Sequence, residues 1–323
     1  MPNPLCQSWP DHTVANTIDV LGLGCLAVDE LLILPHWPEP DTKTRLTGRD
    51  RQGGGLTGNA LVAAARYGAR CAYAGPLGLD ADSQFIRDLF AHEGINLAHA
   101  TTLAEARPIR STILVDQQNR TRTILFDLAG SVGALTDLPD DAVILSSKVL
   151  FVDHYGIEGM IRAAKLARAH GIPVVADLER NEWPGFDELL DLVDHLIVTR
   201  AFASKLTGES SPASAVKRLW KSDRQVVVVT CGEEGAWWCD RLQSTPTHLP
   251  AFPIEVVDTT GCGDAFHGIY AAGLALGEPL ETRLLHASAG AALKARHLGA
   301  QRGLPTRAEV LRFVIKLTVV PCE

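Results

Sequence analysis

Short apolar runs and longer amphipathic stretches alternate through the second half of the chain. Apolar runs with the length of buried strands lie at 148–153, 172–177, 196–199 and 226–230. Stretches with the helical spacing of apolar positions lie between them, at 158–170, 186–193 and 211–220. Strands that alternate with helices predict an α/β fold with a doubly wound, mostly parallel sheet flanked by helices. Ligands bind such sheets at the carboxyl ends of the strands. The polar residues expected at these ends are Asp153, His154, Asp177, Thr230 and Asp264.

Two segments interrupt this alternation with strand-like residues, at about 33–51 and 107–127. The second resembles a hairpin, because strand-like residues flank a polar turn. A small sheet of this kind cannot bury enough apolar surface by itself, so it needs another surface to pack on. We therefore predict a small separate sheet. Its arginines Arg110, Arg120 and Arg122 could reach an anionic substrate group, but we expect them to be solvated.

The first apolar run, residues 18–34, contains the pattern Gly22-x-Gly24-x-x-Ala27. In a dinucleotide-binding fold this pattern follows a strand and opens a helix. The residues after it continue here as a strand, so the pattern is weak evidence for a nucleotide-linked oxidoreductase. Asp29 is a lone carboxylate inside the run and needs hydrogen-bond partners or a ligand. A satisfied turn or edge aspartate is an equally good interpretation.

The composition is that of a folded globular chain. Its 323 residues are 46% apolar and 21% charged, which is enough to bury a full core. We expect one α/β domain over 18–323, preceded by a loose arm over 1–17 that lacks the basic and apolar regions of a signal peptide. The formal net charge of −8 argues against nucleic acid or an anionic membrane as a partner. No apolar run approaches membrane-spanning length.

The cysteines are scattered and contain no Cys-x-x-Cys pair. They are Cys6, Cys25, Cys71, Cys231, Cys239, Cys262 and Cys322. This spacing favours free thiols over a disulfide framework or a zinc site. Free thiols are typical of a reducing compartment, so we predict a cytoplasmic location.

The strongest chemical signal is the stretch Gly261–Asp264, which is Gly-Cys-Gly-Asp. Apolar residues 254–257 predict a strand before it, and 265–276 predict a helix after it. Backbone N–H groups at a helix start point at one spot and favour an anion there. A carboxylate beside a held phosphate suits phosphoryl transfer to an alcohol. A strand–helix turn with Asp264 as N-cap is the simpler interpretation.

A second glycine-rich stretch, Gly53–Asn59, precedes a small-residue helix over 60–67. Glycines at a helix start let a ligand approach the backbone closely. The Asn59 amide can both donate a hydrogen bond to a hydroxyl and accept one from it. A flexible loop is the simpler interpretation of this stretch.

The stretch Asp258–Asp264 resembles the C-terminal signature of the ribokinase-like (PfkB) carbohydrate kinases, with Cys262 in place of the usual alanine. Gly53–Asn59 resembles the N-terminal signature of the same family. The resemblance covers roughly residues 18–315. It implies a ribokinase-like enzyme that uses ATP and Mg²⁺ to phosphorylate a hydroxyl of a small sugar or sugar acid. Ribokinases proper usually carry lysine where Leu56 stands, which argues against ribose itself.

The resemblance also implies roles for individual residues. Asp264 takes the hydroxyl proton, beside an anion hole formed by the backbone of Gly261, Cys262 and Gly263. The sugar site consists of Asp29, Gly55, Asn59 and His154. The nucleotide site consists of the loop residues Thr230, Gly232 and Gly235, and of Ser288 on a helix of small residues.

One family feature is missing. Many members carry Asn-x-x-Glu, which organises magnesium and phosphate, where this chain has Thr199–Phe202. We therefore assign Mg²⁺, held through water, to Asp177 and Glu179, and the resemblance admits a monovalent cation as well. The missing motif keeps open a non-catalytic sugar sensor on the same scaffold. In this family the two segments at about 33–51 and 107–127 build a small β-sheet lid, which covers the sugar and often carries the dimer contact. The resemblance therefore implies such a lid here, and we predict a homodimer through it.

Overall fold

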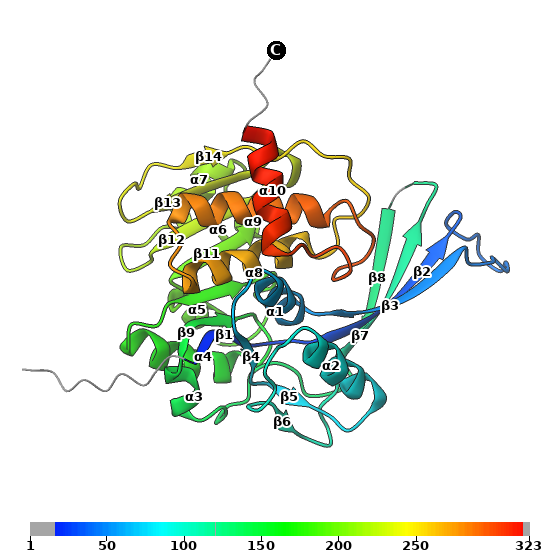
Figure 1. Cartoon of the computed structure of the whole chain (residues 1–323), viewed down its shortest axis with the longest axis horizontal. Coiled ribbons are helices and arrows are strands. Elements are labelled where there is room, and N and C mark those ends of the chain that lie inside the picture. The colour runs from blue at the N-terminus through cyan, green and yellow to red at the C-terminus, as the bar shows by residue number, and fades with distance from the viewer. Residues whose placement is uncertain (1–16, 120, 319–323) are drawn as a thin grey trace, which may run out of the picture.

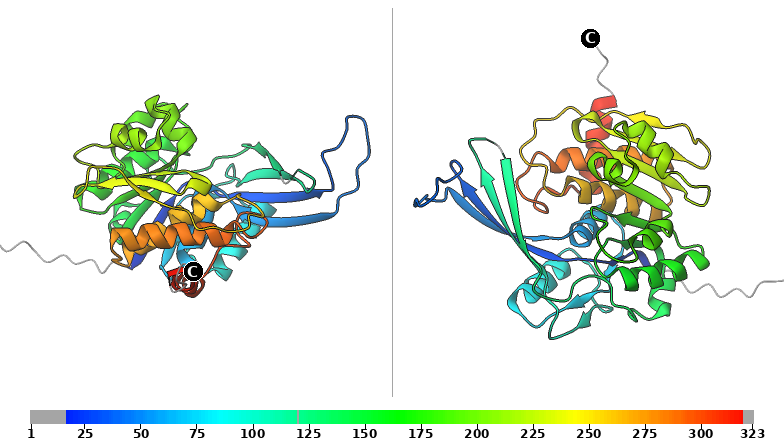
Figure 2. Two further views of the ribbon diagram at one scale, coloured as in Figure 1. Left: turned by 90° about the horizontal axis from the view of Figure 1, so that it is seen from above. Right: turned by 180° about the vertical axis from the view of Figure 1, so that it is seen from behind.

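The computed structural model describes residues 17–119 and 121–318 (Figure 1). The predicted N-terminal arm over 1–17 lies outside the described residues except for Thr17, and Arg120, Cys6 and Cys322 also lie outside them. The described chain forms a layered body, from which a small sheet projects to one side (Figures 1 and 2).

The body is built on an eight-stranded sheet with the order β14-β13-β12-β11-β10-β9-β1-β4. Its strands are β1 (Ile18–Leu23), β4 (Cys71–Tyr73), β9 (Ser147–Val152), β10 (Val174–Asp177), β11 (His195–Thr199), β12 (Val226–Thr230), β13 (Ala236–Asp240) and β14 (Thr247–Leu249). The strands β12, β11, β10, β9, β1 and β4 pair with their neighbours in parallel. The strands β13 and β14 pair antiparallel at one edge of the sheet. The valines of β12 are all buried, as expected of a strand covered on both faces. The predicted mostly parallel sheet is confirmed.

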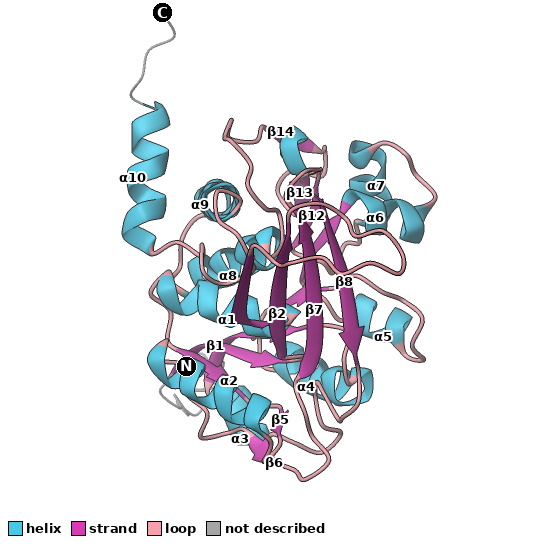
Figure 3. Ribbon diagram, turned by 90° about the vertical axis from the view of Figure 1, so that its right-hand side faces the viewer, coloured by secondary structure: helices cyan, strands magenta, loops and turns pink. Residues whose placement is uncertain are grey.

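Helices cover both faces of this sheet (Figure 3). One hydrophobic cluster includes residues of α1 (Leu56–Arg66), α2 (Ala81–His92), α8 (Cys262–Ala275), α9 (Leu280–Lys294) and α10 (Arg307–Thr318). The other includes residues of α3 (Asp141–Leu145), α4 (Ile157–Ala169), α5 (Phe186–Asp191), α6 (Arg200–Thr207) and α7 (Pro212–Leu219). The two clusters pack helices onto both faces of the sheet. This packing fixes the positions of the loops that follow the carboxyl ends of the strands. None of the described helices has the length and apolar character needed to cross a membrane.

The projecting sheet has the order β3-β2-β7-β8, and we call it the lid. Its strands are β2 (Ala27–Leu34), β3 (Gly48–Gly54), β7 (Ile109–Asp116) and β8 (Thr121–Asp127). β2 pairs in parallel with β7, and β3 and β8 pair antiparallel at the two edges. β8 is exposed along its length. A further two-stranded sheet joins β5 (Pro76–Leu77) to β6 (Thr101–Thr102).

The first lid segment starts earlier than predicted. The expected range was 33–51, but β2 begins at Ala27, because the strand pairs with β7 from Ala27 onward and buries Val28 and Leu31. Residues 35–47 belong to no strand. The second predicted segment, 107–127, coincides with the β7–β8 hairpin.

The strand predicted over 254–257 does not form. The segment has no strand partner among the described residues, and Val256 and Val257 are 48% and 55% exposed. The backbone N–H groups of Val257 and Asp258 instead donate to the carbonyl of Ala295, at 2.8 and 3.1 Å. The chain therefore reaches α8 through an irregular segment attached to the end of α9.

The glycine pattern near the N-terminus links two strands. β1 ends at Leu23 and β2 begins at Ala27, so no helix follows the pattern. Gly24 is needed for packing, since an added Cβ would lie 2.0 Å from Thr57 Oγ1 and 2.2 Å from Asp153 Oδ2. The dinucleotide interpretation therefore lacks the strand–helix context that it requires.

Candidate active site

A cavity of about 330 Å³ lies between the carboxyl ends of the main sheet and the lid. Its lining draws on β2, β7 and β8 of the lid, on the starts of α1 and α8, and on the segments after β9 and β10. The predicted site residues that it brings together are Asp29, Gly55, Asn59, His154, Glu179 and Asp264. Residues far apart in the sequence thus converge on one place.

Asp264 is the third residue of α8, whose N-cap Gly261 has a φ of 76°. A Cβ on Gly261 would lie 2.9 Å from the Ala300 backbone, so both the conformation and the contact require glycine. A Cβ on Gly263 would meet nothing within 4 Å, so a ligand can approach the helix start there. Asn59 Nδ2 donates to Asp264 Oδ2 at 2.6 Å and fixes the carboxyl in the cavity.

Three carboxyls, those of Asp177, Glu179 and Asp264, form an acidic cluster, of which Glu179 and Asp264 line the cavity. Burial raises the pKa of Asp264 well above its ordinary value, and the charge of Asp177 adds to the effect. Burial likewise raises the pKa of Asp177, the last residue of β10, and the charge of Glu179 adds to that effect. A carboxylate with a raised pKa is a better acceptor for a hydroxyl proton near neutral pH.

His267, which was not among the residues predicted for the site, lies one turn after Asp264 on α8. Its Nδ1 is 2.8 Å from the carbonyl oxygen of Gly263, and its Nε2 is 3.0 Å from that of Ile197. Nδ1 also lies 3.3 Å from Asp177 Oδ2, within ion-pair distance but without hydrogen-bond geometry. The ring therefore links α8 to β11 beside the acidic cluster. Its spacing of three residues from Asp264 was the available signal.

Asp177 and Glu179 are the candidates for holding Mg²⁺. The described residues contain no group of three His, Cys, Asp or Glu side chains placed to hold a metal. Asp177 Oδ2 is buried without a hydrogen-bond partner among these residues. Glu179 borders both the first cavity and a second of about 260 Å³, which Thr199, Phe202 and Lys205 also line. Two carboxylates fit a Mg²⁺ ion that takes its other ligands from water and phosphate oxygens.

The positions of the missing Asn-x-x-Glu motif have structural tasks. Thr199 is the N-cap of α6, and its Oγ1 accepts the backbone N–H of Phe202 at 3.2 Å. The Phe202 ring is buried and packs edge-on against Phe186, with 6.0 Å between the ring centroids. Neither position offers a carboxylate to a metal.

Asp29 lies in β2 with its carboxyl in the cavity. Burial raises its pKa to about 6, and a hydrogen bond from Ser111 opposes the rise. A Cβ on Gly54 would lie 2.5 Å from Asp29 Oδ2, and Gly55, with a φ of 87°, packs on the Cys25 backbone. The glycines thus leave room around a buried carboxylate that can accept hydrogen bonds from hydroxyls.

His154 follows β9 and is buried against aromatic rings. Its ring stacks on Trp183 at 5.3 Å and lies 4.5 Å from the Tyr155 ring. Burial lowers its pKa to about 4, and the charge of Arg180 contributes. Neither ring nitrogen has a hydrogen-bond partner among the described residues. A neutral imidazole with both nitrogens available can donate to one hydroxyl and accept from another.

Arg180 also lines the cavity, although it was not among the residues predicted for the site. Its guanidinium lies 5.0 Å from the centre of the Phe126 ring on β8, a cation–π distance. It directly follows Glu179 and offsets part of that negative charge. Arg180 therefore connects the segment after β10 with the lid.

Two of the lid arginines, Arg110 and Arg122, form ion pairs but remain exposed, as expected of solvated charges, and Arg120 lies outside the described residues. Arg122 Nη1 donates to Thr259 Oγ1 at 2.8 Å and lies 3.8 Å from Asp258 Oδ1. Arg110 forms an ion pair with Asp82 at the start of α2. Arg122 thus joins β8 of the lid to the segment before α8. A movement of the lid would therefore also move the residues that lead into the anion hole.

The predicted nucleotide residues line neither of the two cavities. Thr230 ends β12, Gly232 begins a short 3₁₀ turn that Gly235 ends, and Ser288 is half-buried on α9. Arg200 forms a bidentate ion pair with Glu234 in that turn, at 2.7 and 2.5 Å. The turn is thereby held to the start of α6.

Comparisons with known proteins agree with the fold and the two signatures. A family model described as pfkB family carbohydrate kinase matches residues 25–307. The ribokinase of Haemophilus influenzae is 28% identical over 304 residues, which are 90% of this chain and 97% of that protein. A crystal structure from Agrobacterium tumefaciens, provisionally described as a ribokinase, has a TM-score of 0.87 at 25% identity and covers 94% of this chain and 99% of its own. The Arabidopsis thaliana ribokinase complexed with ribose and ATP has a TM-score of 0.80 at 22% identity, with 92% and 98% covered. The predicted ribokinase-like fold is confirmed.

Proposed function

The chain belongs to the pfkB family of carbohydrate kinases, and from that premise we propose that it transfers the γ-phosphoryl group of ATP to a hydroxyl of a small sugar or sugar acid, with Asp264 as the general base. The position of Asp264 carries this proposal. Its carboxyl faces the cavity and accepts a hydrogen bond from Asn59 at the open start of a helix.

The proposed chemistry uses the two halves of this arrangement. The substrate hydroxyl gives its proton to Asp264 as its oxygen attacks the γ-phosphorus, and ADP leaves with the electrons of the broken P–O bond. The backbone N–H groups of Gly261 and Gly263, at the positive end of α8, stabilise the charge on the transferring group; that of Cys262 can join them only by leaving the carbonyl oxygen of Thr259, to which it donates at 3.2 Å. The raised pKa of Asp264 gives its ionised carboxylate a higher proton affinity, which favours proton transfer from the substrate hydroxyl.

Asp29, Gly55, Asn59 and His154 orient the sugar. Asp29 and His154 line the cavity from two different elements, β2 and the segment after β9, so they can hold different hydroxyls of one sugar. Leu56 also lines the cavity, at the position where ribokinases usually carry lysine. This apolar contact argues for a sugar other than ribose, even though ribokinases are among the relatives.

The nucleotide binds along Thr230, Gly232, Gly235 and Ser288, and Asp177 and Glu179 hold Mg²⁺ through water. When bound, Mg²⁺ neutralises charge on the phosphates. The Arabidopsis ribokinase structure with ATP supports this nucleotide at the level of the fold. A monovalent cation would need a group of backbone carbonyl oxygens near the anion hole. The carbonyls of Asp258 and His297 there are already bonded to the ammonium of Lys294, so the residues present do not fit this cation.

The protein forms a homodimer through the lid. β8 is an edge strand whose residues are all exposed, and Ile124, Leu125 and Phe126 are 45%, 55% and 44% exposed. A two-fold contact between two such edges would cover Leu125, whereas Ile124 and Phe126 line the cavity. Phe126 also touches Arg180 of the cavity, so the dimer would steady the lid over the substrate.

We place the protein in the cytoplasm. The support is the state of the cysteines, since Cys25, Cys71, Cys231, Cys239 and Cys262 are all free. Most of them are buried, so a reducing compartment keeps them as thiols at no cost to the fold.

A phosphorylation screen tests the proposal. The purified chain is mixed with Mg-ATP and, separately, with pentoses, hexoses, ketoses, sugar acids and nucleosides, and sugar-dependent ADP release is measured. We expect release with at least one class of sugar. Sugar binding without ADP release would favour the non-catalytic sensor, which the missing Asn-x-x-Glu motif suggests. NAD(H) binding without ATP binding would favour the oxidoreductase.

A further inference from the structure

Lys294, the last residue of α9, has a fully buried side chain. A lysine ammonium is almost never buried unless other groups compensate the loss of water. Its Nζ donates to the backbone carbonyl oxygen of Asp258 at 2.8 Å and to that of His297 at 3.2 Å. The ion pairs found among the described residues do not include this ammonium. Two backbone carbonyls therefore compensate it, one in the segment before α8 and one just past the C-terminus of α9, where the helix dipole favours a cation.

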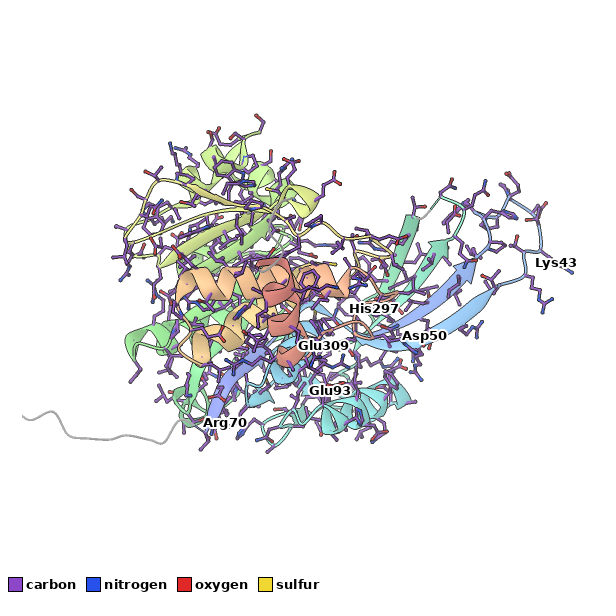
Figure 4. The ribbon with its side chains drawn as sticks, turned by 45° about the horizontal axis from the view of Figure 1, so that its top comes forward. Lys43, Asp50, Arg70, Glu93, His297 and Glu309 are labelled. Carbon is purple, nitrogen blue, oxygen red and sulfur yellow. The ribbon has the colours of Figure 1, made fainter. Side chains whose placement is uncertain are left out.

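The two carbonyls belong to segments that meet beneath the anion hole. We call residues 257–261 the anion-hole loop and residues 295–299 the α9 loop. Figure 4 labels His297 of the α9 loop, near the lid strand that carries Asp50. The Asp258 carboxylate accepts the Gly299 N–H at 2.8 Å and the Thr260 N–H at 2.9 Å. The ammonium thus lies at the joint between both loops.

The charge of Lys294 also reaches the reacting end of α8. Burial lowers its pKa, while Cys262, Asp258 and Asp264 act in the opposite direction. Cys262 and Asp264 are residues of the first turn of α8, so a positive charge lies close to the place proposed for the transferring phosphoryl group. Fixed positive charge beside such a group stabilises it without reorganisation.

Carbonyl oxygens around one cation are also the way in which proteins replace the hydration shell of a potassium ion. The ammonium of Lys294 is of similar size and charge, and it is tied to the chain. A dissolved cation would have to displace it to reach the same oxygens.

We propose that Lys294 is a built-in monovalent cation. It holds the anion-hole loop against the α9 loop, so that this protein needs no dissolved potassium or ammonium ion to form the anion hole. Lys294 is a positioning residue, since it acts through the backbone of Asp258. The kinetic part of the inference rests on the proposed phosphoryl transfer, whereas the structural part does not.

The test compares the wild type with Lys294→Ala and Lys294→Met in choline chloride and in potassium or ammonium chloride at equal ionic strength. Wild-type turnover should be the same in all three salts. Lys294→Ala should lose at least about tenfold in choline, since a direct anion-hole donor is worth about 10²–10³. Potassium or ammonium should restore it by entering the vacated space. Lys294→Met should lose turnover without recovery, because its side chain fills that space.

Thermal melting gives a readout that needs no substrate. The melting temperature of Lys294→Ala should rise in potassium over choline, and that of the wild type should not. Arg224→Ala is the matched control. Arg224 is also buried and donates to backbone carbonyls, those of Val193 and Leu219, but it lies at the amino ends of the strands, away from the site. This variant should have a lower melting temperature than the wild type, and potassium should not change that temperature. Its turnover per folded molecule should be unchanged.

Three results would overturn the proposal. They are activation of the wild type by potassium, full turnover of Lys294→Met in choline, and a folded Lys294→Ala whose melting and turnover ignore potassium. If Lys294→Ala does not fold, Lys294→Met decides. If no sugar is phosphorylated, the proposed function fails, while the melting comparison still decides the role of Lys294.

Discussion

Replacing Asp29 with asparagine should stabilise the free protein while weakening its binding of sugar. Burial raises the pKa of Asp29 from 3.8 to about 6 in the folded chain. A group with a raised folded pKa contributes full stability below its unfolded pKa, and that contribution is lost as the pH rises through the folded pKa. Ionised Asp29 therefore opposes folding at neutral pH, and Asp29→Asn removes this opposition.

The magnitude follows from the same pKa. A rise from 3.8 to about 6 corresponds to at most about 3 kcal/mol at pH 8 and roughly half of that at pH 5. The stability gain of Asp29→Asn should therefore grow between these two pH values. Loss of the carboxylate acceptor should weaken sugar binding by about 1–3 kcal/mol, or about fivefold to 150-fold, and leave ATP binding unchanged.

Chemical denaturation at pH 5 and pH 8 measures the first effect, and calorimetry with each ligand alone measures the second. Asp153→Asn is the matched control, because burial raises the pKa of Asp153 to about 6 as well. The Asp153 carboxylate accepts hydrogen bonds from Cys25 N and Thr57 Oγ1, at 2.7 and 2.9 Å, and from Tyr155 N at 2.8 Å. Asparagine cannot accept all of these, so this variant should be less stable. An Asp29→Asn variant that is less stable than the wild type at pH 8, or that loses sugar and ATP affinity equally, would refute the reasoning.

Further outcomes follow from the other parts of the site. His154→Phe keeps the stacking on Trp183 but removes both ring nitrogens, so sugar affinity should fall about fivefold to 30-fold in calorimetry with ATP affinity intact; equal loss of both would make His154 structural. Leu125→Asp puts a charge on the exposed edge of the lid and should give a monomer in sedimentation at micromolar concentration; an unchanged dimer, or a wild-type monomer, would exclude the lid contact. Glu234→Gln removes the charge that pairs with Arg200 and should raise the KM for ATP about twofold to fivefold without changing the KM for the sugar. An unchanged KM for ATP would mean that this turn does not contribute to nucleotide binding.

The features that were predicted correctly depend on patterns of residues that lie close together in the sequence. The valine run of β12 and the strand–helix alternation before it are the local pattern of a buried parallel strand. The two glycine-rich signatures specify their helix starts through their own backbone requirements, as Gly261 shows with its positive φ. These stretches, and the cavity residues they carry, could be predicted because nothing distant decides their form.

The predictions that failed depend on distant partners. Residues 254–257 have the apolar pattern of a strand, yet a strand also needs a neighbour, and theirs is the end of α9. Asp29 belongs to the lid because β2 pairs with a strand about eighty residues later. Pairing is a tertiary property, so the start of the lid could not be read from local pattern alone.

The site residues that were missed are those whose role comes from burial. Lys294 lies 36 residues from Asp258, and His267 lies 70 residues from Ile197. On sequence alone each is an ordinary residue of an amphipathic helix. Only packing shows that one is a buried cation and that the other contacts two carbonyls.

The turnover of Asp264→Asn, measured beside its ATP affinity, tests the central claim most directly. Asparagine keeps the size of the side chain and its contact with Asn59 but cannot take a proton from the substrate. With the sugar identified by the screen, turnover should fall by about 10²–10⁴, the usual contribution of a positioned base, while calorimetry shows unchanged ATP binding. A folded Asp264→Asn variant with near-normal turnover would contradict the assignment of Asp264 as the base.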